Sequence, residues 1–422
     1  MPETFKSPQG TFDVLPPESR AYETLVSRFA SRVRAAGYGL IVNPMFEDVG
    51  VFQRVGESTD VVRKEMYDFF DKGDPPRHLA LRPEVTAGVA RAFVQHRPPV
   101  PWKVWTVTPA FRYERAQAGR YRQHHQLDVE ALGTEDPLLD VEVIALLAGF
   151  YAELGLRRVT LRLNSLGDNT CRPAYRAELE AFLAARAGQL CDEHKERFRD
   201  NPLRVLDCKR PECLAATQDA PFPVDRLCEA CAAHFARVQE GLIALGVRFS
   251  LDKRLVRGLD YYTRTTFEFA AEALAAAQNG VGGGGRYDGL VEALGGPPTP
   301  GIGFGTGIER LRLACTAEGV DLVGDCGVDA FVVDTTGGLR ALLITHRLRA
   351  AGVSADRAWD ERSFKAQFKA ADRSGARIAV VVGPEEVERG VVGLKPLRGG
   401  EQVEVAEELL VQRVREMIDA SD

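Results

Sequence analysis

The chain has 422 residues, enough for two or three domains. Its hydrophobic content of 45% and charged content of 27% are typical of a soluble globular protein and exclude a disordered chain. The net charge of −6 excludes a general affinity for nucleic acid, so an RNA partner must be bound by local basic patches. Because neither a secretory leader nor an apolar run of about 18 residues is recognised, we expect a cytoplasmic protein without a membrane span.

An amphipathic helix is predicted over residues 17–36. Its apolar side chains recur at helical spacing, and Gly37 suits its end. The strand-like segment IVNPMFE follows. Because Pro44 cannot donate a backbone hydrogen bond, we expect this strand at a sheet edge or at an interface.

Residues 102–134 predict a long antiparallel hairpin, in which the polar AQAG joins WKVWTVTPAFRYER to RQHHQLDVEALG. Alternation along a strand places Arg112 and Glu114 on one face of the first strand. One face of the second strand then carries only polar residues, namely His124, Gln126, Asp128 and Glu130. Two interpretations stay open, a polar pocket or a half-exposed sheet.

The hairpin is also the densest basic stretch of the chain. FRYERAQAGRYRQHHQ, residues 111–126, carries Arg112, Arg115, Arg120, Arg122, His124 and His125 around the single acid Glu114. This concentration of basic residues indicates that the segment binds an anion.

Residues 169–249 are expected to be mostly helical. Within them, Cys208-x4-Cys213 and Cys228-x2-Cys231 have a spacing compatible with a four-thiolate zinc site. The alternative is a set of small, partly buried thiols.

Two glycine-rich stretches follow, VGGGGRYDGL and GIGFGTGIERLRLA, and neither contains a dinucleotide fingerprint or a phosphate loop. In the second, alternate residues of a predicted strand are glycine, which leaves one face bare for a flat ring or for close packing against a helix. Arg310 opens the following helix, from which it can reach a phosphate.

From about Val328, FVVD, LRALLITHRLRAAG, SFKAQFKAADRSGA and RIAVVVG alternate between strand and helix. They predict a small α/β domain with a largely parallel sheet. One of its helices separates an apolar face (Phe364, Phe368, Ala371) from a basic face (Arg362, Lys365, Lys369, Arg373). The basic face is either solvated or contacts RNA.

These segments together resemble a known family. FRYERAQAGRYRQHHQ resembles the second signature of class II aminoacyl-tRNA synthetases, GIGFGTGIERL the third, and PMFE the first, which in that class lies at a dimer interface. LVRGLDYYT and GGGGRYDGL resemble the two signatures of histidyl-tRNA synthetases, and LRPEVT and SFKAQFKAADRSGA are also similar to that family. The resemblance implies an α+β fold, with a class II antiparallel-sheet core over residues 1–325. A helical insertion over 170–249 interrupts this core, and an α/β anticodon-binding domain spans 326–422.

The activity that the resemblance implies is ATP-dependent activation of L-histidine to histidyl-adenylate, followed by transfer to the 3′ end of tRNA(His). ATP is then a substrate, Mg²⁺ accompanies its phosphates, zinc is not required, and the protein is a homodimer. The alternative is a regulatory histidine-binding subunit of ATP phosphoribosyltransferase. Such subunits typically lack the C-terminal domain and the arginine of the RGLDYYT signature, whereas this chain has both.

The family pattern also implies roles for individual residues. The catalytic residues are Arg112 and Arg257, which contact the α-phosphate. Glu114, Tyr121 and Arg310 bind other parts of ATP. The histidine ammonium group meets Glu84, Thr86 and Gln126, and the imidazole pocket consists of Glu130, Tyr262 and Tyr287.

The chain departs from the family pattern at three positions. Ala116 and Ala118 replace a proline and a basic residue in the hairpin loop, so contacts of this loop with the tRNA end are not predicted. His124 stands where a phenylalanine usually stacks on adenine, which predicts weaker stacking.

Overall fold

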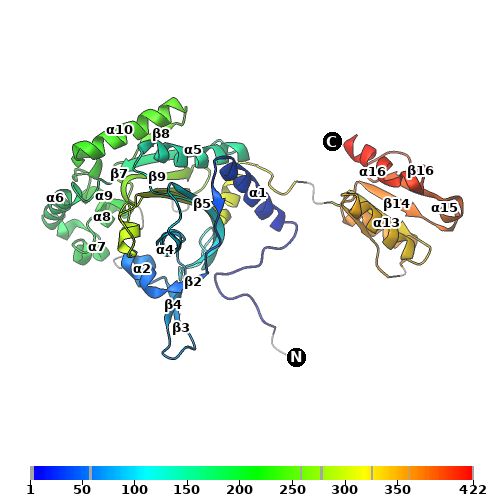
Figure 1. The fold of residues 1–422 in the computed structure, drawn as a ribbon, viewed down its shortest axis with the longest axis horizontal. Coiled ribbons are helices and arrows are strands. Elements are labelled where there is room, and N and C mark those ends of the chain that lie inside the picture. Colours follow the sequence, from blue (N-terminus) through cyan, green and yellow to red (C-terminus); the bar gives the residue numbers. More distant parts are fainter. Residues whose placement is uncertain are drawn as a thin grey trace. The chain divides into compact units, whose positions relative to one another are not determined.

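The structure, a computed structural model, describes residues 4–56, 59–256, 259–275, 279–324, 327–360 and 362–420. The chain forms two compact units, residues 1–322 and 323–422, each with its own hydrophobic core (Figure 1). Among the described residues, no helix combines the length and the apolar character that crossing a membrane requires.

Unit 1, residues 1–322, combines α-helices and strands. The helices are α1 (Ser19–Ala35), α2 (Val49–Gly56), α3 (Asp60–Arg63), α4 (Thr86–His96), α5 (Pro137–Leu154), α6 (Arg172–Ala184), α7 (Asp192–Arg197), α8 (Leu203–Asp207), α9 (Pro211–Ala216), α10 (Glu229–Ala244), α11 (Leu290–Ala293) and α12 (Ile308–Ala317). The strands are β1 (Gly39–Leu40), β2 (Phe46–Asp48), β3 (Tyr67–Phe70), β4 (His78–Leu81), β5 (Trp102–Phe111), β6 (Gln123–Leu132), β7 (Val159–Ser165), β8 (Phe249–Leu251), β9 (Thr263–Ala271), β10 (Gly280–Arg286) and β11 (Gly301–Gly307).

An eight-stranded sheet in the order β1-β5-β6-β11-β10-β9-β7-β8 organises this unit. Its pairs are antiparallel except at the two ends, where β1 runs parallel to β5 and β8 parallel to β7. One face packs against α1 and α5: the ring of Phe29 lies edge-on to those of Trp105, Phe150 and Phe304, and Tyr151 donates to Thr306 Oγ1 at 2.9 Å. Alternation then turns the odd-numbered glycines of β11 to the opposite face, which carries the candidate site.

The predicted hairpin is confirmed, with a register from Trp102 opposite Leu132 to Phe111 opposite Gln123. The prediction that Arg112 and Glu114 lie on its first strand is wrong, because β5 ends at Phe111. Beyond that point the backbone bonds to other segments: Tyr113 N donates to Glu65 O at 2.6 Å, and Arg122 N to Gly10 O at 2.8 Å. The connection is therefore a long loop rather than AQAG alone.

The first predicted helix is confirmed as α1, and Gly37 follows it in the left-handed region at φ +83°. The strand predicted around Pro44 is shorter than expected, because β2 begins at Phe46 and Pro44 lies before it. Among the described strands β2 pairs with β4 alone, at one edge of a three-stranded sheet of order β2-β4-β3, so the expected edge position is confirmed for β2.

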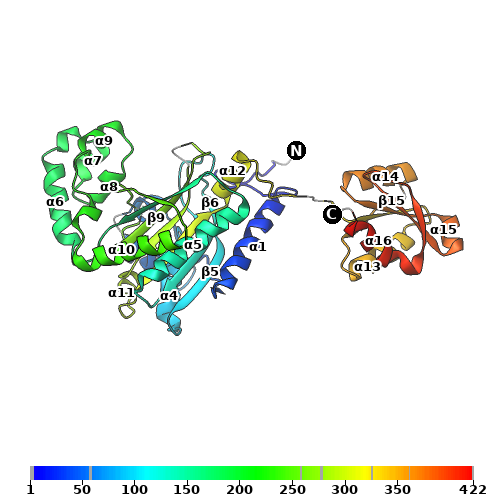
Figure 2. The same cartoon turned by 90° about the horizontal axis from the view of Figure 1, so that it is seen from above.

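The helical region predicted over 169–249 consists of α6 to α10 with two short 3₁₀ turns, Ala187–Gln189 and Pro223–Arg226. Both views show α6 to α9 gathered at one end of unit 1, while α10 leads back along α5 (Figure 2). This insertion has its own core of leucines and aromatic residues.

Unit 2, residues 323–422, has the sheet order β13-β12-β14-β15-β16. Its elements are β12 (Ala330–Asp334), α13 (Leu339–Ala350), β13 (Ala355–Arg357), α14 (Phe364–Arg373), β14 (Ile378–Val382), α15 (Pro384–Arg389), β15 (Val391–Pro396), β16 (Val403–Ala406), a 3₁₀ turn (Glu407–Leu409) and α16 (Leu410–Asp419). The expectation of a largely parallel sheet needs correction, because β15 and β16 are antiparallel. The short α15 does not provide the crossover that a parallel return requires.

On α14, Ala371 is buried, Phe368 is half-buried, and Phe364 remains 48% exposed. The predicted apolar face is thus buried only toward the C-terminal end of the helix. The basic side chains of Lys365, Lys369 and Arg373 are exposed.

Candidate active site

The glycines of β11 make room for side chains of neighbouring elements. A Cβ atom at Gly303 would lie 1.8 Å from Glu130 Oε2, and one at Gly301 would lie 2.2 Å from Tyr287 Cε2. At Gly305 it would lie 2.5 Å from Asp128 Oδ1. The glycine face is therefore occupied by acidic and aromatic side chains rather than left bare or packed on a helix. Only toward Gly307, where a Cβ would meet nothing within 4 Å, does the strand open into a cavity.

This cavity is lined by glycines of β10 and β11 and by side chains from the hairpin and α12. Its charged and polar lining consists of Arg112, Glu114, Arg120, Tyr121, His124, Gln126, Glu268, Glu309 and Arg310. The backbone of the glycine strands forms one wall, so a flat group can lie against it without meeting side chains.

The arginines are fixed by neutral oxygen atoms. Arg112 Nε donates to Pro83 O at 2.8 Å, while Arg310 donates from Nε to Gly119 O at 3.0 Å and from Nη1 to Gly280 O at 2.9 Å. Burial, and next the charge of Arg120, lower the pKa of Arg310. Because carbonyl partners orient a guanidinium without neutralising it, these arginines keep positive charge for an anion.

Some basic residues of the hairpin line the cavity and others do not. Arg112 and Arg120 line the cavity, and Arg120 lies 3.7 Å from Glu114. Arg122 instead stacks its guanidinium 4.0 Å from the centre of the Tyr113 ring, and Arg115 is exposed. Only part of the basic stretch therefore faces the cavity.

The two histidines of β6 point to opposite faces, as alternation predicts. His124 lines the cavity, and its burial together with Arg112 lowers its pKa to about 3, so the ring is neutral at pH 7. His125 turns away, and its Nδ1 lies 2.9 Å from Glu309 Oε1. Glu309 also accepts from the His125 backbone at 3.0 Å, which joins α12 to β6.

Further along the same face of β6, Glu130 is the centre of a buried hydrogen-bonded cluster. Its Oε1 accepts from Thr86 Oγ1 at 2.6 Å, and its Oε2 accepts from Tyr287 at 2.5 Å. Glu84 lies in the turn before α4, where it accepts from the backbone of Thr86 and Ala87, both at 2.9 Å, and from Tyr261 at 3.2 Å.

The carboxyl groups of this cluster are held in a setting that disfavours their ionised form. Burial raises the pKa of Glu130 to about 8 and raises the pKa of Glu84. The pKa of Asp128 is raised well above its usual range, by burial and then by the charges of Glu130 and Glu84. Three such carboxyl groups in one place are suited to a ligand that brings positive charge or hydrogen-bond donors.

The structure brings most of the predicted site residues into one of these two places. Arg112, Glu114, Tyr121, Gln126 and Arg310 line the cavity, whereas Glu84, Thr86, Glu130 and Tyr287 form the cluster. The remaining predictions concern Tyr262, which is buried with its ring centre 4.8 Å from that of Tyr261, and Arg257, which lies outside the described residues.

Among the site residues to which the sequence assigned no role are Tyr261, Asp128 and Glu268. Alternation along β6 already turned Asp128 toward the face of Glu130, which was a usable signal. Glu268 lines the cavity from β9, on the partner strand of the glycine-rich β10. For the two adjacent tyrosines, 261 and 262, the sequence offers no signal that says which one reaches the carboxyl groups.

The four cysteines predicted to share one site do not do so. Cys208 and Cys213 lie with Cys191 and His194, whereas Cys228 and Cys231 lie with Cys171 and Asp168. The prediction grouped two pairs of cysteines that are close in sequence. In the fold, each pair lies instead beside residues that precede it in the chain, near the starts of α7 and α6 respectively.

The comparisons with known proteins agree with this architecture. The family described as "Histidyl-tRNA synthetase" matches residues 10–311, and the one described as "Anticodon binding domain" matches residues 338–417. A histidine–tRNA ligase of Rhodococcus erythropolis is 49% identical over 422 residues, which covers 99% of each chain, and one of Moorella thermoacetica is 49% identical over 97% of this chain and 98% of the other. The crystal structure of apo S. aureus histidyl-tRNA synthetase matches with a TM-score of 0.83 at 34% identity, covering 98% of this chain and 100% of that one. The fold is thus the α+β fold of class II synthetases, and the chain belongs to the histidyl-tRNA synthetase family.

Proposed function

We propose that the chain is a histidine–tRNA ligase, which activates L-histidine with ATP and transfers it to the 3′ end of tRNA(His). The observation that carries this proposal is the position of a buried carboxyl cluster at the end of an arginine-lined cavity, on one continuous face of β6. The cluster suits a cationic amino acid, and the cavity suits a polyphosphate.

In the activation step, a carboxylate oxygen of histidine attacks the α-phosphorus of ATP while the bond to the β-phosphate breaks and pyrophosphate leaves. Such an in-line displacement depends on positioning and charge stabilisation. We assign Arg112 to the α-phosphate and Arg310 to the γ-phosphate, because both face the cavity with carbonyl oxygens holding them in place. Arg257 is assigned to the α-phosphate from the resemblance alone.

The adenine ring is assigned to the wall formed by the glycine strands. His124 lines the same cavity, and its neutral imidazole is suited to stacking on a base. Glu114 and Tyr121, which also line the cavity, are assigned to the nucleotide.

Magnesium is the metal expected with the ATP phosphates. The cavity fits it, because Glu114 and Glu268 supply carboxylate oxygens beside the phosphate-binding arginines, and Mg²⁺ prefers oxygen ligands. When bound, the ion neutralises charge on the departing pyrophosphate. Glu268 is our first choice for its protein ligand.

Recognition of histidine is assigned to the cluster together with Gln126 of the cavity and the buried Tyr262. Glu84, Thr86 and Gln126 surround the ammonium group, and Glu130, Tyr262 and Tyr287 surround the imidazole. An apolar amino acid would leave these buried groups without partners, and such a mismatch reduces reaction by about 10⁴-fold or more. This pocket therefore gives selectivity without an editing site.

We assign activation to unit 1 and tRNA anticodon binding to unit 2. The support in unit 2 is a groove lined by Arg357, Arg362 and Phe364, with the guanidinium of Arg357 4.0 Å from the Trp359 ring centre. Trp359 is 57% exposed, and exposed aromatic and arginine side chains are typical of surfaces on which unpaired bases stack. Charging of tRNA also implies a cytoplasmic location.

We propose a homodimer because apolar side chains are exposed at two edge strands of unit 1, β1 and β2. Apolar side chains around β1 and β2 are exposed, among them Val42 at 84% and Phe46 at 52%. Exposed apolar side chains that gather at a sheet edge are typical of a subunit interface.

The regulatory-subunit alternative has less support, because the anticodon-binding family matches residues 338–417 and the ligase relatives align over nearly the whole chain. Aminoacylation with labelled histidine tests the proposal. We expect tRNA(His) to be charged and other tRNAs to remain uncharged. Binding of histidine without any charging would favour the regulatory alternative.

A further inference from the structure

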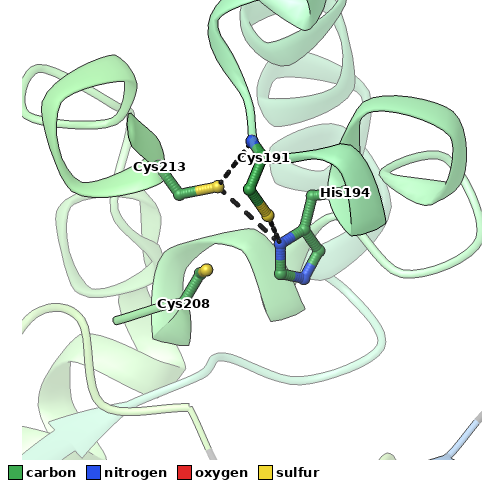
Figure 3. A group of neighbouring side chains, drawn as sticks. All are labelled: Cys191, His194, Cys208 and Cys213. Atoms are coloured by element: carbon green, nitrogen blue, oxygen red, sulfur yellow. Dashed lines mark hydrogen bonds between the residues drawn. The ribbon is translucent and has the colours of Figure 1, made fainter. Parts of the chain in front are cut away.

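A cluster of sulfur and nitrogen ligands lies in the helical insertion, away from the cavity. Its members are Cys191, His194, Cys208 and Cys213 (Figure 3). They come from three short helices: Cys191 precedes α7, His194 lies within it, Cys208 follows α8, and Cys213 lies in α9. Figure 3 shows the three sulfur atoms and the imidazole directed toward one another.

The distances between the ligand atoms are compatible with a tetrahedral metal site. The three Sγ atoms and the ligand nitrogen all lie within 4.8 Å of one another. His194 Nδ1 is 3.2 Å from Cys191 Sγ and 3.7 Å from Cys213 Sγ. Ligands bound to zinc at about 2.3 Å in tetrahedral geometry lie roughly 3.8 Å apart, so an ion between them needs only small side-chain movements.

The surroundings also suit thiolates. Cys191 and Cys213 are buried, and His194 and Cys208 are half-buried, so the site is enclosed on one side and reachable from the other. The backbone N–H of Cys191 points at Cys213 Sγ from 3.4 Å, a contact that stabilises a thiolate ligand. The cysteines are free rather than paired in disulfides.

We propose that Cys191, His194, Cys208 and Cys213 form a structural zinc site. Three thiolates and one imidazole are a common zinc ligand set, and a site closed by four protein ligands is structural rather than catalytic. Soft sulfur ligands exclude Mg²⁺ and Ca²⁺ as occupants, since both prefer oxygen.

The second cluster receives no such assignment. Its cysteines approach one another, with Cys171 Sγ 3.9 Å from Cys231 Sγ, but the fourth member is an aspartate with other partners. Asp168 accepts from the backbone of Thr170 at 2.9 Å and lies 3.4 Å from Arg264 Nη2. Its carboxylate is thus engaged by protein donors.

The zinc ion supplies stability that the local sequence lacks. Helices α7, α8 and α9 have six, five and six residues, which is below the length at which a helix persists alone. A shared ion links all three. The same core cluster that contains Cys191 and Cys213 also includes Tyr262 of the candidate histidine site.

The test is the metal content of the full chain, purified without chelator and measured by mass spectrometry, for the unmodified protein, Cys208→Ser and Cys228→Ser. We expect about one zinc per chain in the unmodified protein, and retention of that zinc in Cys228→Ser. We expect loss of most of it in Cys208→Ser. An unmodified protein without zinc, or a Cys208→Ser protein that keeps it, would overturn the proposal, as would equal loss in both variants.

A second measurement uses the unmodified protein, in case Cys208→Ser does not fold. After treatment with a chelator, alkylation of Cys191, Cys208 and Cys213 should increase severalfold, while alkylation of Cys171 and Cys228 should stay constant. Reloading with Co²⁺ should produce the visible absorption of a tetrahedral thiolate complex. Alkylation that is indifferent to the chelator would contradict the proposal.

Discussion

At the scale of single residues, Glu130 is central, because it links Thr86 and Tyr287 and faces the glycine strand. Gly303→Ala should remove this arrangement without introducing a charge. The added Cβ would lie 1.8 Å from Glu130 Oε2 and 2.4 Å from the backbone oxygen of Val129, so both the carboxyl group and the adjacent backbone of β6 must move. We expect the Kd for histidine, measured by calorimetry, to rise by about 10-fold to 100-fold, the loss that follows when a buried hydrogen-bonding partner is displaced and other groups are left unpaired.

Gly289→Ala is the matched control for this change. A Cβ there meets nothing within 4 Å, and the position lies outside both the cavity and the cluster. An equal loss of affinity in both variants would show that the glycine substitutions act through general stability.

The raised pKa of Glu130 predicts how stability depends on pH. Its pKa is about 8 in the folded chain against an ordinary value of 4.5, so between these two pH values the folded form keeps a proton that the unfolded form has lost. The contribution of Glu130 to the free energy of unfolding therefore decreases as the pH rises from 5 to 8, by at most about 1.4 kcal/mol per pH unit. Urea denaturation should show Glu130→Gln gaining stability relative to the unmodified protein over this range.

The exposed Glu292, changed to Gln, is the control and should follow the unmodified protein at every pH. A Glu130→Gln curve that stays parallel to the unmodified one would contradict the burial argument.

The positions of single site residues were predicted correctly where they follow from the alternation of side chains along a strand. The common face of His124, Gln126, Asp128 and Glu130 follows from the period of a strand. The contact between Tyr261 and Glu84 does not, because it joins two turns that are distant in sequence. The motif roles came from the family resemblance rather than from alternation.

At the scale of elements, α12 and the hairpin loop meet through Arg310, which donates to Gly119 O. Arg310→Ala should release the loop and remove a cation from the cavity. We expect the KM for ATP in pyrophosphate exchange to rise by about 10-fold to 100-fold, since a charge-assisted contact contributes roughly 1.5 to 3 kcal/mol.

Arg312→Ala on the same helix is the control. Its side chain instead pairs with Glu18 at 2.6 Å, so the KM for ATP should change little. A KM that is unaffected by Arg310→Ala would rule out its contact with the nucleotide.

The elements themselves were largely predictable. The hairpin and α1 have strong periodicity, and both are confirmed. The extent of the hairpin loop was not predictable, because it is set by bonds to Glu65 and Gly10 in other segments. The antiparallel pairing of β15 and β16 was missed because it depends on the short connections after β14 and β15 rather than on the composition of the strands.

At the scale of the whole molecule, the exposed apolar edge around β2 predicts a dimer. Phe46→Glu should shift the protein toward a monomer in sedimentation analysis, because a buried charge without a partner opposes association. Ile243→Glu on α10, where the apolar side chain is likewise exposed (67%), should leave the oligomeric state unchanged. A dimer of undiminished stability in Phe46→Glu would refute this interface.

The two-part organisation of the chain was foreseeable from its alternating segments, and the family was foreseeable from its motifs. The grouping of the cysteines was not. Cys191 and His194 are separated in sequence from Cys208 and Cys213 by α8. The folded insertion brings the four residues together.

The most direct test of the whole account is ATP–pyrophosphate exchange without tRNA, with each of the twenty amino acids tested separately. The site described here, with buried carboxyl groups at the end of an arginine-lined cavity, predicts exchange with histidine alone. Absence of exchange when histidine still binds, or exchange with an apolar amino acid at a similar rate, would contradict it.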